Sequence, residues 1–147
     1  MPPSPPGNAT YAADIAGSQK GMTMSHEEHQ ICIEACQQCV EACEHCATAC
    51  LHEDDVKMMA RCIELDRSCA DICSYAVREM SRGSSFAERV CALCAEVCDA
   101  CSEECAKHKA PHCQECAKTC RECAEACRQM AGAGGAPSGA VDRPLRR

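Results

Sequence analysis

Large hydrophobic side chains are scarce in this sequence of 147 residues, which contains no Trp, one Phe and two Tyr. Leu, Ile, Val and Phe together number 16, about 11% of the chain and below the roughly 20% at which disorder is the default expectation. The apolar fraction of 46% consists mainly of 24 Ala and 19 Cys. A core, if the chain folds, must therefore consist largely of cysteine.

Other features are also absent. The net charge is −7, and Lys and Arg do not cluster except in the last few residues, which argues against nucleic-acid partners. No apolar run approaches the roughly 18 residues that span a membrane. The first residues lack a basic segment followed by an apolar one, so they do not resemble a secretory signal. We therefore expect a cytoplasmic protein whose thiols stay reduced, and an odd cysteine count fits this better than a closed disulfide framework does.

The sequence divides into three parts. Proline-rich residues 1–24 predict a flexible arm with at most a short helix, and Gly/Pro-rich residues 132–147 predict a disordered tail. Residues 25–131 carry the helical pattern and predict a four-helix metal-binding bundle.

Four helices are expected within this central part. Two capping boxes, Ser25 with Glu28 and Ser85 with Glu88, mark the starts of the first and third, and Pro111 suits the first position of the fourth. Connections of a few residues make consecutive helices antiparallel neighbours. The fold class is therefore all-α, an up-down-up-down antiparallel four-helix bundle. The expected helices are 25–51, 54–81, 85–108 and 111–130.

The cysteines follow a helical register. In the first, third and fourth helices they are separated alternately by 3 and 4 residues, an average of 3.5 that keeps them on one stripe facing the neighbouring helices. We expect the second helix to turn one face inward as well, formed by Met58, Cys62, Leu65, Cys69, Cys73, Ala76 and Met80. A core of Cys and Ala leaves space that larger side chains normally fill, so the interior is predicted to hold metal. The expected cysteine ligands are Cys32, Cys36, Cys39, Cys43, Cys46, Cys50, Cys62, Cys69, Cys73, Cys91, Cys94, Cys98, Cys101, Cys105, Cys113, Cys116, Cys120, Cys123 and Cys127.

Several kinds of thiol chemistry compete for this stripe. Disulfides are disfavoured because side chains on one helical stripe project in parallel, and iron–sulfur clusters usually take their cysteines from loops. Zinc could be held by four thiolates from two helices, but each such site leaves two uncompensated negative charges in an apolar interior. Cu(I) prefers thiolates, and one Cu⁺ per thiolate makes the core neutral at any length. We therefore predict many Cu(I) ions per chain.

Histidine and methionine extend the register beyond the cysteines. At one end they are Met58 and His108, with His52, His112 and Met59 on the turns; at the other they are His29, Met80 and Met130, with His26 close by. We predict that the first group is a metal entrance and add His108, His112 and Met58 to the expected metal ligands. His45 falls outside the stripe and is expected to be exposed.

These segments resemble a known family. "CIEACQQCVEACEHCATAC", "CALCAEVCDACSEECAKH" and "PHCQECAKTCRECAEAC" are similar to the bacterial copper storage proteins, over roughly residues 25–131. The resemblance implies a four-helix bundle that holds many Cu(I) ions, belongs to the cytosolic branch, assembles as a homotetramer and loads through a histidine-bearing end. In the second helix Leu65 and Ala76 stand where cysteine could stand.

We therefore expect a protein that stores and sequesters copper ions in the cytoplasm, roughly one per cysteine, and exchanges them with an unidentified copper donor or acceptor protein. The alternatives are a zinc or cadmium thiolate store and a thiol redox protein. An enzyme is disfavoured because no cysteine is distinguished by a unique His or acidic partner.

Overall fold

The computed structural model describes residues 26–133, with side chains for 29–132. The arm expected at 1–24 and nearly all of the tail expected at 132–147 lie outside this range, as does Ser25 with its capping box. The described part of the chain is helical and contains no strand. Its elements are α2 (His26–Cys50), the 3-10 turn η1 (Val56–Met59), α3 (Ala60–Arg82), α4 (Ala87–Ala106) and α5 (Pro111–Ala133).

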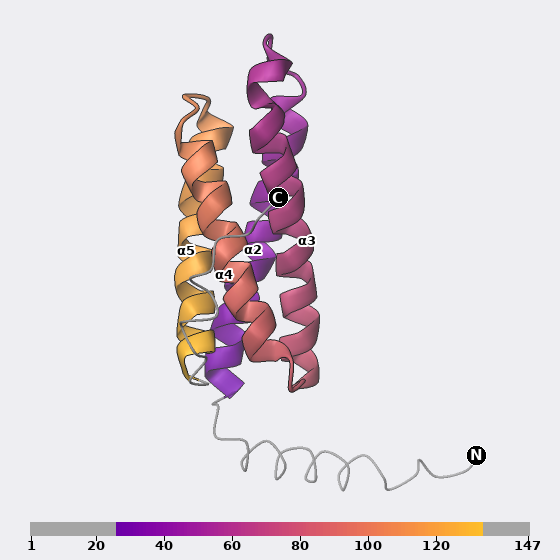
Figure 1. Ribbon diagram of the computed structural model, residues 1–147, viewed down its shortest axis with the longest axis vertical. Coiled ribbons are helices and arrows are strands. Elements are labelled where there is room, and N and C mark those ends of the chain that lie inside the picture. Colours follow the sequence, from indigo (N-terminus) through magenta and orange to yellow (C-terminus); the bar gives the residue numbers. More distant parts are fainter. Residues whose placement is uncertain (1–25, 134–147) are drawn as a thin grey trace, which may run out of the picture.

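The four α-helices form one bundle. Helix α2 packs against α3 and α5, and α4 packs against the same two helices. Figure 1 shows the three connections at alternating ends, so that consecutive helices run in opposite directions. The predicted fold class, an up-down-up-down four-helix bundle, is confirmed. No described helix is both long enough and apolar enough to cross a membrane.

The α2–α3 connection sets the register of α3. Asp55 caps η1, its side chain accepting a hydrogen bond from the Met58 N–H at 3.3 Å. A 3-10 turn has three residues per turn, so the residue above Cys62 on the inner face is Met59 and not Met58. Met59 is 6% exposed and Met58 67% exposed. The expectation that Met58 faces the interior is therefore wrong.

The α3–α4 connection differs from the expected capping box. Gly83 adopts a left-handed conformation, φ 65°, that lets its N–H bond the carbonyls of Glu79 and Met80. Helix α4 begins after Phe86, which makes no side-chain cap. The hydroxyl that serves this turn belongs to Ser84, which accepts from the Phe86 N–H at 3.0 Å. Ser85 is therefore not the N-cap of α4.

The α4–α5 connection is short and held by a side chain. Pro111 is the first residue of α5, as predicted, where its missing N–H costs nothing. The Gln114 amide donates to the carbonyls of His108, at 2.6 Å, and Ala106, at 3.2 Å. These bonds fix His108 and His112 at the same end of the bundle as the α2–α3 connection.

Cysteine forms the core. Each of the nineteen cysteine side chains is at most 1% exposed. Small alanines such as Ala76 and Ala124 pack beside them. Val40, Ile63 and Leu65 are partly buried and pack against this core. The largest fully buried side chain is a carboxylate, Asp66. Cysteines therefore face inward in every helix, as the 3/4 spacing predicts.

Candidate metal centre

The nineteen thiols point at one another along the bundle axis. All are free, and every one except Cys91 has another cysteine sulfur 3.2–4.0 Å away, well beyond the roughly 2.05 Å of a disulfide. With metal–sulfur bonds of about 2.3 Å, as in zinc thiolates, three sulfurs around one ion lie about 4.0 Å apart. The observed spacing is therefore that of sulfurs able to share metal ions.

Sulfurs from all four helices meet in the middle of the bundle. The Cys39 Sγ of α2 lies 3.5 Å from Cys69 of α3, 4.0 Å from Cys98 of α4 and 3.7 Å from Cys120 of α5. Cys43, one turn along α2, lies 3.5 Å from Cys120. Cys39, Cys43, Cys69 and Cys120 form one of several four-thiol groups whose sulfurs are all within 4.8 Å of one another.

The sulfur column continues toward the N-terminal end of α2. Cys73 lies 3.7 Å from Cys123, which in turn lies 3.7 Å from Cys36. Cys127 lies 3.6 Å from Cys36 and 3.7 Å from Cys32. No sulfur in this chain of contacts is farther than 4.0 Å from the next, so an ion bound at one group is adjacent to the next.

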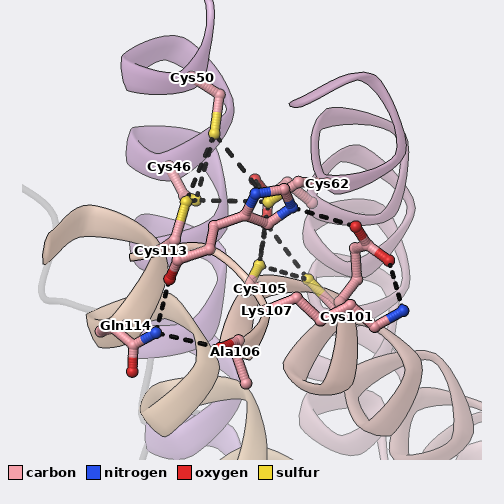
Figure 2. A network of polar contacts seen from close by, with 12 residues as sticks. Cys46, Cys50, Cys62, Cys101, Cys105, Ala106, Lys107, Cys113 and Gln114 are labelled. Atoms are coloured by element: carbon pink, nitrogen blue, oxygen red, sulfur yellow. Dashed lines mark hydrogen bonds and ion pairs between the residues drawn. The ribbon is translucent and has the colours of Figure 1, made fainter. Parts of the chain in front are cut away.

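At the opposite end the column meets a histidine. The Cys50 Sγ lies 3.8 Å from Cys113, 4.0 Å from Cys62 and 3.6 Å from the His112 Nε2. Figure 2 shows the labelled side chains of Cys46, Cys50, Cys62 and Cys113 pointing toward one another here. Cys46, Cys50, Cys113 and His112 together can hold one ion.

His112 and His108, at this end of the bundle, also contact carboxylates. The His112 Nε2 lies 3.5 Å from Glu53, and the His108 Nε2 lies 3.1 Å from Glu104. The two imidazoles are 14% and 11% exposed, whereas Cys50 is fully buried. His112 therefore lies between solvent and the first thiols, with the partly buried His108 at the same end, and we call these two residues the mouth.

The other His and Met residues predicted at the two ends of the bundle differ in burial. His52 is exposed, with its Nδ1 3.0 Å from the Thr48 carbonyl, and Met58 is exposed as well, so neither reaches the sulfur column. At the other end Met80 and Met130 are buried and His29 is partly buried. The side chain of His26 lies outside the described residues. His45 is exposed, as expected.

The sequence interpretation missed Asp66, a carboxyl inside the sulfur column. Its Oδ1 accepts hydrogen bonds from Cys101 and Cys116, both at 3.2 Å, and from Cys105 at 3.5 Å. Its Oδ2 lies 3.8 Å from Cys62. A signal for it exists, since positions 62, 66, 69 and 73 repeat the 4, 3, 4 spacing of the other helices.

Burial keeps these groups neutral in the metal-free bundle. Desolvation raises the pKa of Cys50, and it raises that of Cys113 to about 11. Burial also raises the pKa of the Asp66 carboxyl to about 8, and the neighbouring Cys116 acts in the same direction. Metal binding to these thiols therefore has to displace protons.

Comparisons with known proteins give a consistent result. Residues 25–132 match the sequence profile of the family described as copper storage protein. The structure is similar to that of the Cu(I)-bound copper storage protein BsCsp3 of Bacillus, with a TM-score of 0.69, 53% identity and coverage of 71% of this chain and 98% of that one.

A second solved structure shows copper loading to a cytosolic copper storage protein from Streptomyces lividans, with five coppers. Its TM-score is 0.70 and its identity 39%, over 72% of this chain and 93% of that one. A curated relative, the uncharacterized cysteine-rich protein YhjQ of Bacillus subtilis (strain 168), is 54% identical over 67 residues, 46% of this chain. The match spans 62% of the length of that relative.

Proposed function

Because the chain belongs to the copper storage protein family, we propose that it stores many Cu(I) ions, roughly one per cysteine, inside its helical bundle. The observation that carries this function is the column of nineteen buried, free thiols, eighteen of which have another cysteine sulfur 3.2–4.0 Å away. Cu(I) is the cargo, and thiolates are the ligands that this soft ion prefers. All nineteen cysteines are the proposed ligands.

Charge favours Cu(I) over a divalent ion throughout this column. One Cu⁺ for each thiolate leaves the interior neutral, however many ions it holds. A stack of divalent ions with four thiolates each would leave two negative charges per ion in a space walled by alanine and cysteine, which is costly to bury. A zinc or cadmium store is therefore disfavoured.

The mouth is the proposed route of entry. His112 lies 3.6 Å from Cys50 and is partly exposed, so its imidazole can bind an ion from solvent and pass it to buried thiols. His108, held by Glu104, lies beside this route. Met58, proposed from the sequence as a ligand, is exposed on η1 and is not part of this set.

The setting proposed for this chain is the cytoplasm, as for the Streptomyces neighbour that is described as cytosolic. Storage requires no catalysis, and we propose no enzymatic activity. A homotetramer and an exchange partner that donates or accepts copper complete the proposal. Sedimentation velocity of the apo and loaded protein tests the tetramer, and a sedimenting monomer in both states would remove it.

A thiol redox protein is the rival from a different class, and alkylation separates the two. The reduced protein is incubated with or without excess Cu(I), transferred to urea so that burial no longer hides the thiols, and treated with iodoacetamide. Mass spectrometry then counts labelled cysteines. Storage predicts near-complete labelling without copper and protection of most cysteines with it. Full labelling in both samples would contradict storage.

A further inference from the structure

Asp66 lies among the thiols of the sulfur column, and the side chains around it, which we call one level of the column, offer a different set of donor atoms. Among the described residues, it is the only carboxyl that accepts hydrogen bonds from cysteine. It is fully buried in the middle of α3, and the thiols that contact its Oδ1 come from α4 and α5. The three helices thus converge on one oxygen, and the level contains three sulfurs and a carboxylate, whereas four-thiol groups such as that around Cys39 contain only sulfur.

The three sulfur–oxygen distances around Asp66, and the sulfur–sulfur distance between Cys101 and Cys105, are close to those of a tetrahedral site. With zinc–sulfur bonds of about 2.3 Å and zinc–oxygen bonds of about 2.0–2.2 Å, a tetrahedron has sulfur–oxygen edges of about 3.5 Å and sulfur–sulfur edges of about 3.8 Å. The Asp66 Oδ1 lies 3.2 Å from Cys101 and Cys116 and 3.5 Å from Cys105. The Cys101 and Cys105 sulfurs are 3.9 Å apart. Three thiols from two helices therefore already lie around the Asp66 oxygen at about the edge lengths of such a site.

The donor set distinguishes between metals. Carboxylate oxygen suits harder and borderline ions, whereas Cu(I) selects thiolates and gains little from oxygen. We propose that Asp66, Cys101, Cys105 and Cys116 form a site for one borderline divalent cation of the Zn²⁺ or Co²⁺ class, which retains that ion until the other cysteines have bound Cu(I). A single divalent ion adds its excess negative charge once, unlike the stack of such ions that burial disfavours.

The proposed site predicts the order in which added Cu(I) displaces bound divalent ions. Four-thiol groups such as that around Cys39 bind a divalent ion and Cu(I) through the same sulfurs, so Cu(I) displaces the divalent ion there first. At Asp66 the divalent ion keeps one oxygen bond that Cu(I) cannot replace. A divalent ion held there is therefore the last to leave as copper is added.

The test uses the full-length, reduced, metal-free protein under argon with Co²⁺ as the probe. Tetrahedral thiolate-bound Co²⁺ is read from its charge-transfer and visible bands. Wild type is compared with Asp66→Asn, which keeps the shape of the side chain but not its charge. Asp71→Asn, an exposed position on the same helix, is the matched control. Circular dichroism and Cu(I) capacity are measured on every sample, so a failure of copper storage is recognised separately.

The expected result is one tight Co²⁺ per chain with a three-thiolate spectrum, released by Cu(I) only after the other cysteines have filled. Asp66→Asn should weaken it by at least about tenfold, the lower end of what loss of an outer-shell partner costs, while Asp71→Asn should not. If Asp66→Asn does not fold, Asp66→Cys should bind Co²⁺ but release it early. Equal affinity in wild type and Asp66→Asn, or release with the first additions of Cu(I), would overturn the proposal.

Discussion

The buried Asp66 carboxyl makes the stability of the metal-free bundle depend on pH. Its pKa is about 8 in the folded chain, against an ordinary value of 3.8, because burial disfavours the ionised form. Between these values the unfolded chain has lost this proton and the folded chain still binds it. The folded state is therefore favoured most below pH 4, and this contribution is lost as the pH rises toward 8.

The magnitude follows from linkage. Between pH 5 and pH 8 the carboxyl is ionised in the unfolded chain and mostly protonated in the folded chain. Each pH unit therefore lowers the free energy of unfolding by about 1.36 kcal/mol, and the three units together lower it by about 4 kcal/mol. Above pH 8 the unfolded thiols begin to ionise as well, so the comparison stays within this range.

The assay is urea unfolding of the reduced, metal-free protein at pH 5 and pH 8, followed by circular dichroism. The free energy of unfolding of the wild type should fall by about 4 kcal/mol more than that of Asp66→Asn between pH 5 and pH 8. Asp71→Asn, exposed on the same helix, should follow wild type. If the free energy of unfolding changes equally with pH in wild type and Asp66→Asn, the carboxyl is not held neutral by the sulfur core.

Three further predictions concern the apo state, the mouth and the register of α3. The reduced, metal-free protein should already be helical, since its buried thiols are neutral and need no metal to pack; a random-coil circular dichroism spectrum would contradict this. Replacing His108 and His112 together with Ala should slow Cu(I) loading in stopped-flow absorbance several-fold while leaving capacity unchanged, and unaltered kinetics would remove the entrance. Met59→Ala should cost about 2–3 kcal/mol of unfolding free energy because Met59 is buried, whereas Met58→Ala should change it by less than about 0.5 kcal/mol. Equal effects in urea unfolding would contradict the register assigned to α3.

The sequence was sufficient to predict the bundle and the inward direction of the cysteines. Alternating intervals of 3 and 4 keep a stripe on one side of a helix regardless of what fills it, and three helices carry this pattern without a break. Short connections then leave little choice but antiparallel neighbours. The fold therefore rests on periodicity, which local sequence expresses directly.

Register at a helix start could not be predicted in the same way. Counting back four residues from Cys62 gives Met58, but the chain enters α3 through a 3-10 turn, and the buried residue is Met59. Ser85 likewise had the pattern of a cap, yet the Ser84 hydroxyl accepts the bond and α4 begins later. Both differences are shifts of one residue that depend on how two helices meet.

Asp66 was missed for another reason. A carboxylate on a helix is normally exposed, and Leu65, on the other side of the cysteine stripe of the same helix, offered an apolar residue in its place. Burial of Asp66 becomes reasonable only when Cys101, Cys105 and Cys116 are placed around it, and these come from helices far along the chain. The contacts of His112 with Cys50 and Glu53 are non-local in the same sense.

Copper storage requires that Cu(I) fill the sulfur column. The most direct measurement is an anaerobic Cu(I) titration of the reduced protein against a chromophoric Cu(I) chelator, with Zn²⁺ titrated in parallel. We expect saturation near one Cu(I) per cysteine, close to the nineteen thiols of the chain. Saturation at one or two copper ions, or tight binding of four to five zinc ions, would contradict it and favour a copper chaperone or a zinc store.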